Sequence, residues 1–417
     1  MHLRLRGPRP HNPTPESPYE VLALFTGAMV GASLFIVGTG SLMTFFRMEL
    51  GLGQVELGLI LSVQMLGSVA MTSVAGLLTD RYGDRAVVFW SGLFMGLALI
   101  AGSLVQNYTW LVTCLLAYGI GYAAVTPAGS HAIIFFFKKA DRGLAMGVRQ
   151  CGVPLAGVIA SLLLPAIAAR FEYRGALAAA GILTLMACSV ASRLYREPQE
   201  LQGERVSVRA MLVEMLSIAR EPRLILLTIT SMILICAQFA LIGFLSFTFV
   251  HVALYPIEVA VGLFTISQVA AIAGRLGWGW ISDHIFGGSR TLPLGVVCVL
   301  VALVALGMST ASPAMPYWLA AGLAAALGFT AEGWLGVSVI GFAEIGGEER
   351  SGSALGVGLT WTLLAAMLTP AVFGAVAQVH GFDYAWRGLA LISVLGVVPA
   401  LLASSVVVGI LQRERLP

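Results

Sequence analysis

Long apolar runs follow one another along almost the whole chain, separated by short polar breaks. Each run holds about 20 apolar residues or more, which is the length that a helix needs to cross the roughly 30 Å hydrocarbon core of a bilayer. Backbone groups inside a bilayer must bond to one another, so the spanning segments are helices or strands of a closed barrel. Barrel strands alternate in polarity at every second residue, and these runs do not. The pattern therefore predicts an all-α membrane protein.

The runs predict twelve membrane helices, in two groups of six on either side of a polar stretch. We expect a tail at 1–20, a first unit at 21–194, a linker at 195–222, a second unit at 223–411 and a tail at 412–417. The predicted helices are 21–46, 57–79, 86–105, 110–137, 143–169, 175–194, 224–250, 258–282, 292–309, 317–343, 353–379 and 388–411.

Composition supports a membrane protein, because 58% of the residues are apolar and only 11% are charged. A soluble protein keeps about 25% charged residues to cover its surface. The five cysteines lie inside apolar runs, a placement that suits small buried side chains better than disulfides or metal ligands. No spacing of His, Cys and carboxylate residues suggests a metal site, so we expect no metal, no cofactor and no nucleic-acid partner.

Positive charge is unevenly distributed between the two ends of the predicted helices. If the N-terminal tail is cytoplasmic, only Arg47, Arg170, Arg174 and Arg387 of the 24 lysine and arginine residues fall in loops on the opposite side. Basic residues concentrate on the cytoplasmic side of membrane proteins. We therefore expect a multi-pass protein of the plasma (inner) membrane with both termini in the cytoplasm.

One short motif occurs in both halves of the chain. It closes the second predicted helix at 76–85 and the eighth at 279–290, and in both copies a glycine precedes an aspartate by four positions. A six-helix unit repeated in parallel is the internal symmetry of one class of secondary transporter. In that class the substrate site lies between the repeats, near the midplane of the bilayer.

The first copy, Gly-x-x-x-Asp-Arg-x-Gly-x-Arg, resembles the signature between helices two and three of the major facilitator superfamily. The resemblance covers the whole chain and implies two pseudo-symmetric six-helix bundles. It also implies a conformational latch at the helix ends, with cytoplasmic ion pairs made by Arg81 and Arg85. The alternative is that these residues only anchor helices at the membrane surface. The predicted latch residues are Gly76, Asp80, Arg81, Gly83, Arg85 and Asp283.

Arg275 lies eight residues before Asp283, so about 12 Å inside the end of its helix. A charge at that depth costs several kcal/mol and requires a reason. Arginine carries a planar fork that matches a carboxylate. The spacing Arg275-x-x-x-Gly279-x-x-x-Asp283 resembles the monocarboxylate transporters, whose eighth-helix arginine binds the substrate carboxylate, and the oxalate–formate exchangers also use an arginine in this helix. The alternative is a structural arginine that extends to the cytoplasmic surface.

Arg149 lies at a similar depth in the fifth predicted helix. Helices five and eight meet between the two bundles in the superfamily that the chain resembles, so Arg149 and Arg275 would form an anion clamp there. The alternative is a structural arginine that caps backbone carbonyl groups loosened around Pro154.

Glu332 is the one carboxylate near the middle of a predicted span. Burial favours the protonated form of a carboxyl group, whereas a nearby arginine favours the ionised form. A group that alternates between these surroundings can take up a proton on one side and release it on the other, so we predict that Glu332 couples transport to protons. The alternative is a permanent structural ion pair with Arg275 or Arg149.

Other polar side chains of the spans are candidates for hydrogen bonds to a substrate, although polar residues also join membrane helices to one another. Together with the two arginines, the predicted substrate-binding residues are Tyr118, Tyr122, Gln268 and Trp361.

Two arginines inside the membrane against one carboxylate leave a positive site that an anion would neutralise. We therefore predict a monomeric secondary transporter, embedded in lipid, that moves a small organic anion with protons by alternating access. A monocarboxylate is the expected substrate.

Two other functions remain open at this point. Proton-coupled drug or cation extruders of the same superfamily typically carry an arginine in the fourth helix and a Gly-Pro pair in the fifth. This chain has Leu115 and Gly152-Val-Pro154 at those places. A membrane sensor or enzyme would need an output domain, a nucleophile with its base, or a metal cluster, and we find none in the sequence.

Overall fold

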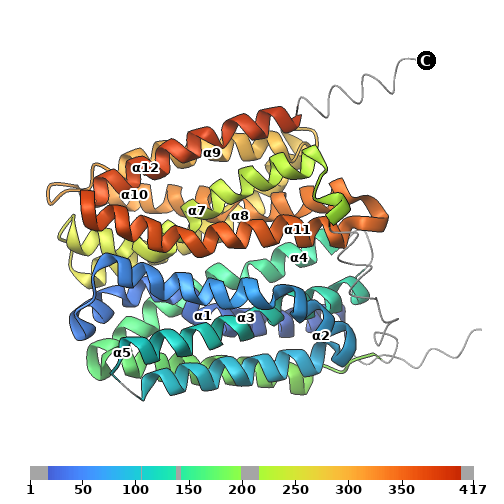
Figure 1. Ribbon diagram of the computed structural model, residues 1–417, viewed down its shortest axis with the longest axis horizontal. Coiled ribbons are helices and arrows are strands. Elements are labelled where there is room, and N and C mark those ends of the chain that lie inside the picture. Colours follow the sequence, from blue (N-terminus) through green and yellow to red (C-terminus); the bar gives the residue numbers. More distant parts are fainter. Residues whose placement is uncertain (1–16, 105, 138–141, 199–215, 405–417) are drawn as a thin grey trace, which may run out of the picture.

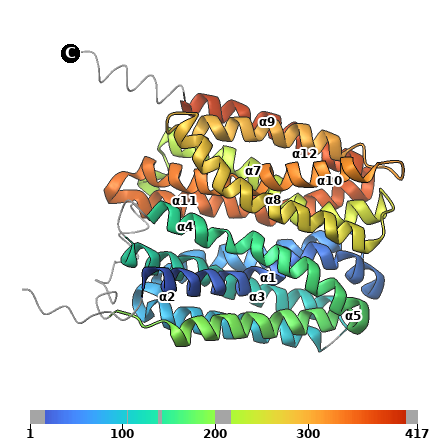
Figure 2. The ribbon, with the colours of Figure 1, turned by 180° about the vertical axis from the view of Figure 1, so that it is seen from behind.

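The structure is a computed structural model that describes residues 17–104, 106–137, 142–198 and 216–404. The helices α1 to α5 form one bundle and α7 to α12 form a second bundle beside it (Figure 1). Figure 2 shows the same division from behind. The elements are α1 (Pro18–Leu50), α2 (Gln54–Ser103), α3 (Tyr108–Phe136), α4 (Arg142–Gln150), α5 (Gly152–Leu194), α7 (Pro222–His251), α8 (Ile257–His284), α9 (Thr291–Met308), α10 (Tyr317–Leu327), the π-helical turn η2 (Gly328–Glu332), α11 (Leu335–His380) and α12 (Phe382–Leu395).

Eleven helical segments within the described residues are long and apolar enough to cross a membrane. One of them, Ala145–Leu194, has 50 residues. As a straight helix it would be about 75 Å long, more than twice the thickness of the hydrocarbon core. Its backbone leaves helical geometry at Phe171 and Glu172, so the segment turns there and crosses twice. This gives the twelve crossings and the all-α fold that the sequence predicts.

Sharp turns also divide α2 and α11, each of which contains two helices. In α2 the turn falls at Gly83, where φ is 81°, a conformation that favours glycine. A Cβ atom there would also overlap the carboxylate of Glu197. In α11 the turn falls at Gly347, with φ 65°. Both turns lie where the sequence predicts a break between spans.

The first and last predicted boundaries differ from the structure. Helix α1 begins at Pro18 instead of 21, because Ser17 accepts a hydrogen bond from the N–H of Tyr19 and Glu20 accepts one from the N–H of Ser17. This is a capping box with proline in the first turn. Helix α12 begins at Phe382 instead of 388, directly after the turn at Gly381. The tail 412–417 and most of the tail 1–20 and of the linker lie outside the described residues.

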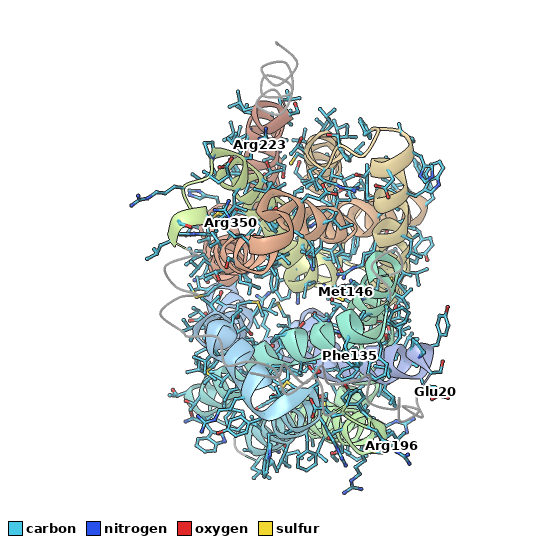
Figure 3. The ribbon with its side chains drawn as sticks, turned by 90° about the vertical axis from the view of Figure 1, so that its right-hand side faces the viewer. Glu20, Phe135, Met146, Arg196, Arg223 and Arg350 are labelled. Carbon is cyan, nitrogen blue, oxygen red and sulfur yellow. The ribbon has the colours of Figure 1, made fainter. Side chains whose placement is uncertain are left out.

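Both the first and the last described residues lie at one end of the two bundles, at the right in Figure 1. We call this the termini end. Figure 3 views it directly, with Arg196 of the first bundle and Arg223 and Arg350 of the second around its margin. Basic residues at this end agree with the charge asymmetry of the sequence.

Three pairs of helices form the boundary between the bundles: α1 with α7, α2 with α11, and α5 with α8. The helices approach one another closely at glycines, which have no side chain. A Cβ atom at Gly40 of α1 would overlap the carbonyl oxygen of Ile242 in α7, and one at Gly58 of α2 would overlap that of Pro370 in α11. Small residues permit such contacts between membrane helices. These four residues lie in the half of the molecule away from the termini end, so the bundles are tightly closed there.

Candidate functional site at the boundary between the bundles

Arg275 of α8 extends across the boundary to the other bundle. Its Nη1 donates a hydrogen bond to the carbonyl oxygen of Gln150 at 2.8 Å. In an uninterrupted helix that carbonyl would accept from the N–H of residue 154, but Pro154 has no N–H. The carbonyl of Gln150, at the break between α4 and α5, is therefore left for another donor, and Arg275 supplies it.

The other edge of the Arg275 guanidinium is formed by Nε and Nη2. The residue is only 8% exposed, and neither Nε nor Nη2 has a hydrogen-bond acceptor among the residues that the structure describes. Buried charged donors without acceptors are costly. Nε and Nη2 form one edge of the planar group, and such an edge can bind both oxygens of a carboxylate through two parallel hydrogen bonds. This edge therefore matches a carboxylate in charge and shape.

Arg149 lies one residue before Gln150 and is fully buried. Its Nη2 donates to the carbonyl oxygen of Val125 at 2.8 Å and its Nη1 to Oγ of Ser130 at 3.1 Å. The guanidinium packs on Gly129 of α3, where a Cβ atom would lie 2.6 Å from Nε. Helix α3 thus holds Arg149 within its own bundle.

The structure places Arg275 near Arg149, because Arg275 bonds to the backbone of the next residue, Gln150. One expectation is corrected. The carbonyl that Pro154 leaves without a donor is capped by Arg275 from the other bundle, whereas Arg149 caps Val125 on α3.

Glu332 ends the π-helical turn η2 and is fully buried. π-helical turns are rare and often occur at functional sites. The turn packs tightly on α8, because a Cβ atom on Gly274 of α8 or on Gly328 of η2 would overlap a carbonyl oxygen of the other element. The absence of these two side chains places Glu332 directly beside α8.

Gln268 pairs with Glu332. Its Nε2 donates to Oε1 of Glu332 at 2.7 Å, while Oε1 of Gln268 and Oε2 of Glu332 have no hydrogen-bond partner in the described part of the chain. Glu332 also interacts electrostatically with Arg275. Gln268 and Arg275 are seven positions apart, so they lie on the same face of α8. The site thus combines a cation, a carboxylate and an amide on two adjoining elements.

The same face of α8 borders the first bundle. A Cβ atom at Gly157 of α5 would overlap Oε1 of Gln268, and the hydroxyls of Ser161 and Thr265 lie 2.7 Å apart. The charged site and its neighbours are therefore at the boundary, where any relative movement of the bundles changes their contacts.

The two predicted tyrosines differ in their roles. Tyr118 is fully buried and donates to the carbonyl oxygen of Ala32 in α1, so it joins α3 to α1. The hydroxyl of Tyr122 lies 3.3 Å from Oγ of Ser33 and interacts electrostatically with both Arg149 and Arg275. Tyr122 belongs to the charged site, whereas the polar atom of Tyr118 is occupied by the fold.

Trp361 does not lie with the charged residues. It is 52% exposed and borders an apolar hollow between α7 and α11, together with residues such as Ile229 and Val357. None of the residues around that hollow belongs to the arginine site. Trp361 is therefore exposed and lies apart from the other predicted substrate-binding residues.

The comparisons with known proteins agree with this architecture. The family described as Major Facilitator Superfamily matches residues 23–345. The chain belongs to the major facilitator superfamily. It is a transporter of this family and not an enzyme.

The chain is also similar over much of its length to other transporters and to a solved structure. An uncharacterized MFS-type transporter of Mycobacterium tuberculosis is 25% identical over 88% of this chain and 81% of its own length. The agnestins efflux protein of Paecilomyces divaricatus is 25% identical over 80% of this chain and 74% of its own length. The 3-(3-hydroxy-phenyl)propionate transporter of Escherichia coli is 26% identical over 61% of this chain and 62% of its own length. The crystal structure of a bacterial homolog of the human lysosomal transporter Spinster matches with a TM-score of 0.70 at 15% identity, covering 93% of this chain and 95% of that one, which shows the shared fold.

The major facilitator signature at 76–85 lies at the termini end. Gly76 lies within α2, and the side chain of Asp80 is outside the part that the structure describes. Arg81 is exposed and packs over the ring of Tyr82 at 5.3 Å. Arg85 donates from Nε to the carbonyl oxygen of Ser192 at 3.0 Å. The expected ion pairs of Arg81 and Arg85 are not found within the described part of the chain.

The second copy of the signature does form ion pairs. Arg290 pairs with Asp283 and, at 2.8 Å, with Glu344 of α11. It also donates to Oγ of Ser282 at 3.0 Å. Burial would lower the pKa of Arg290, but its hydrogen bonds to Glu344 and Asp283 raise that pKa above its ordinary value. Arg290 thus links Asp283, near the end of α8, to Glu344 of α11.

Sequence reasoning did not identify the carbonyl of Gln150 as a partner of Arg275. The signal for it was present, because a proline always leaves the carbonyl four residues before it without a helical donor. Among the described residues no group of three or more His, Cys, Asp or Glu side chains could hold a metal ion.

Proposed function

We propose that this transporter moves a small organic anion, a monocarboxylate, by alternating access coupled to protons. The observation that carries the proposal is the Nε and Nη2 edge of Arg275, which is buried at the boundary between the bundles and has no acceptor among the described residues. A carboxylate would accept both hydrogen bonds and neutralise part of the charge.

Substrate binding and movement are linked through the carbonyl of Gln150. That carbonyl is a neutral acceptor from the opposite bundle, and it holds one nitrogen of Arg275. Hydrogen bonds to a charged acceptor are roughly twice as strong as those to a neutral one. A substrate carboxylate would therefore draw Arg275 away from Gln150 and release one hydrogen bond between the bundles. A ligand shifts a conformational equilibrium only through such a difference in contacts between two states.

Proton coupling follows from the charges of the site. Glu332 interacts electrostatically with Arg275, so an arriving anion competes with Glu332 for the charge of Arg275. A buried carboxylate that loses its cation is costly unless it takes up a proton. Glu332 would therefore carry a proton when Arg275 carries the substrate, and both would leave together.

The names of the relatives support an organic anion. The Escherichia coli relative is a transporter of 3-(3-hydroxy-phenyl)propionate, a substrate with one carboxylate. In this proposal the substrate-binding residues are Arg275, Arg149, Tyr122 and Gln268, and the termini end, with its arginines, faces the cytoplasm of a plasma (inner) membrane.

A second candidate, efflux of a larger organic compound, is favoured by one observation. The relative from Paecilomyces divaricatus is an efflux protein and matches over a larger share of this chain than the propionate transporter does. The two functions differ in the compounds that bind, so one experiment separates them.

Thermal unfolding of the purified transporter tests the proposal. Ligands that bind the folded state raise the unfolding temperature by mass action. The panel contains acetate, lactate, 3-phenylpropionate and oxalate, together with tetraphenylphosphonium and ethidium as cations and the neutral alcohol 3-phenylpropanol. We expect stabilisation by at least one monocarboxylate and none by 3-phenylpropanol, which has the same ring and chain as its acid but lacks the charge. Stabilisation by the cations or the alcohol alone would instead support efflux and contradict the anion proposal.

A further inference from the structure

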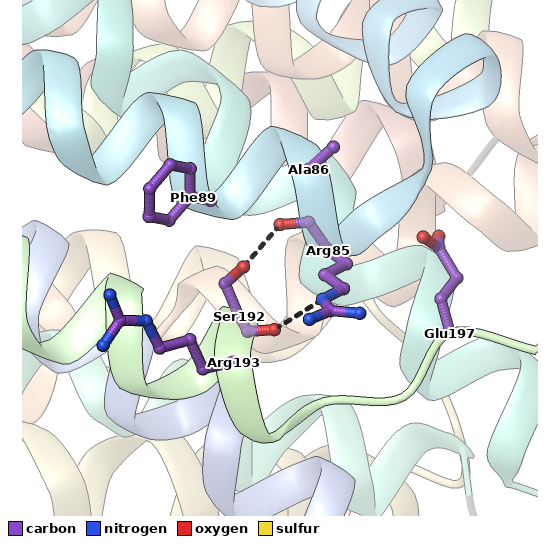
Figure 4. A pocket seen from close by; sticks show the side chains of 6 residues that line it. All are labelled: Arg85, Ala86, Phe89, Ser192, Arg193 and Glu197. Atoms are coloured by element: carbon purple, nitrogen blue, oxygen red, sulfur yellow. Dashed lines mark hydrogen bonds between the residues drawn. The ribbon is translucent and has the colours of Figure 1, made fainter.

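A hollow of about 320 Å³ opens at the termini end of the first bundle, between the second half of α2 and the end of α5 (Figure 4). It is separate from the charged site at the boundary, because the two share no residue. Its lining includes two arginines. The lining residues are Arg85, Ala86, Phe89, Ser192, Arg193 and Glu197.

The two arginines of the hollow differ in how they are fixed. Arg85 is fixed by its Nε, which donates to the carbonyl oxygen of Ser192 at 3.0 Å, while Oγ of Ser192 donates back to the carbonyl oxygen of Arg85 at 3.0 Å. These bonds leave the terminal nitrogens of Arg85 available. Neither Arg85 nor Arg193 forms an ion pair within the described residues. Glu197 at the rim accepts the N–H of Asp84 at 2.6 Å.

The corresponding arginine in the second half of the chain does form ion pairs with carboxylates. Arg290, which closes the second copy of the signature, is bound by both Asp283 and Glu344. Arg85 closes the first copy, and in the described part of the chain no carboxylate takes the equivalent place. Two arginines against the single carboxylate of Glu197 leave the hollow with a net positive charge, which attracts an anion from outside the chain.

The position of the hollow indicates where that anion comes from. Arg85 lies at the start of the span Arg81–Ser103, and Arg193 lies one residue before the end of the span Ala145–Leu194. Both therefore lie at the level where a bilayer has its headgroups. Deeper in the spans the outer surface is apolar, with Trp90 64% exposed and Val190 51% exposed. A free ion would use only the arginines, whereas a phospholipid would use the arginines and the apolar surface.

We propose that this hollow binds an anionic phospholipid, with the phosphate of its headgroup on Arg85 and Arg193 and its acyl chains along the apolar surface of α2 and α5. Basic pockets between membrane helices recognise acidic headgroups in this way. The lipid supplies to the first copy of the signature the negative charge that Asp283 and Glu344 supply to the second. Arg85 follows the turn at Gly83 in α2, and Arg193 precedes the linker at the end of α5. A lipid bound to both would therefore connect these two helices at the termini end.

Native mass spectrometry of the detergent-purified transporter, titrated with phosphatidylglycerol or phosphatidylcholine, tests this inference. We expect phosphatidylglycerol to bind more tightly than phosphatidylcholine to the wild type. Arg193→Gln should weaken phosphatidylglycerol binding by about fivefold, the effect of one arginine near a membrane surface. Arg193 has no hydrogen bond or ion pair within the described residues, so this variant should fold. Arg350→Gln, which removes an exposed arginine from the same end of the other bundle, is the matched control and should bind like the wild type.

Three results would overturn the inference. The first is equal affinity for the two lipids, and the second is an equal loss in Arg193→Gln and Arg350→Gln. The third comes from inorganic phosphate: if millimolar phosphate displaces phosphatidylglycerol from the wild type, the site binds a free anion and not a lipid. None of these results depends on the transported substrate, so the inference and the proposed function fail or stand separately.

Discussion

Arg275 and Gln150 are joined across the boundary of the two bundles by a hydrogen bond of 2.8 Å from the Nη1 of the arginine to the backbone carbonyl. The bond exists because Pro154 gives that carbonyl no helical donor. The proline of one bundle thus provides the binding partner for the arginine of the other. In the proposed mechanism this carbonyl competes with the substrate for Arg275.

The substitution Pro154→Ala tests that competition. It restores an N–H to the helix, so the carbonyl of Gln150 gains a donor in its own bundle and becomes a weaker acceptor for Arg275. We expect the substrate anion to bind about fivefold more tightly, since a hydrogen bond contributes about 1 kcal/mol. Isothermal titration calorimetry with the anion found in the thermal screen measures the change.

The matched control is Pro165→Ala, which removes another proline from the interior of α5. The carbonyl that Pro165 leaves without a donor belongs to Ser161 and not to the partner of Arg275. This variant should bind the anion like the wild type. Equal affinities in wild type and Pro154→Ala, or equal changes in both variants, would show that the carbonyl of Gln150 does not compete with the substrate.

Arg275→Lys tests whether the shape of the guanidinium matters as well as its charge. Lysine keeps the positive charge but cannot form two parallel hydrogen bonds to a carboxylate. We expect anion binding to weaken by about tenfold or more, the effect of losing one hydrogen bond between charged groups. Arg350→Lys, at the exposed termini end, should have no effect. A dissociation constant for Arg275→Lys within twofold of the wild-type value would show that Nε and Nη2 of Arg275 do not bind the carboxylate through two parallel hydrogen bonds.

The spans could be predicted from the sequence because their cause is local. About 20 apolar residues in a row make a crossing regardless of their neighbours, and the turns at Gly83 and Gly347 fall where the pattern breaks. The start of α1 at Pro18 was missed although Ser17 and Glu20 form a visible capping box, because the apolar run begins only after them.

The charged residues of the site could also be predicted, since the cost of burying Arg275 and Glu332 marks them in the sequence. Their partners could not. Gln268 and Glu332 are 64 positions apart and Arg275 and Gln150 are 125 apart, so only the packing of the helices brings them together. The exposure of Trp361 could not be predicted for the same reason, because its helix, α11, has one face on the other bundle and another on the outer surface.

Because α8 packs closely on η2, one methyl group added at position 274 should lower both the stability of the protein and its affinity for the anion. Gly274→Ala would place a Cβ atom on the carbonyl oxygen of a residue in η2, and overpacking of this kind costs about 1–3 kcal/mol. We expect a lower unfolding temperature and weaker anion binding, since α8 would move away from Glu332. Gly262→Ala in the same helix is the control, because a Cβ atom there meets nothing within 4 Å. Gly262→Ala should leave both measurements unchanged. If Gly274→Ala unfolds at the same temperature as the wild type, the close packing of α8 on η2 is contradicted.

Glu332→Gln separates substrate binding from proton coupling. Glutamine has the shape of a protonated glutamate but cannot release a proton, so the variant should mimic one state of the site permanently. We expect it to exchange labelled substrate across proteoliposomes at a rate near that of the wild type, because exchange needs no net proton movement. It should fail to accumulate substrate when an inward proton gradient is imposed, whereas the wild type does so.

The control for this experiment is Glu258→Gln, which removes a carboxylate from the exposed first turn of the same helix that carries Arg275. It should both exchange and accumulate substrate. If Glu332→Gln still accumulates substrate in response to the gradient, the proton is carried elsewhere and Glu332 serves only to hold Gln268 and to balance the charge of Arg275. If exchange is lost as well, while calorimetry still detects binding, Glu332 is needed for the movement of the bundles themselves, which contradicts a role confined to proton coupling.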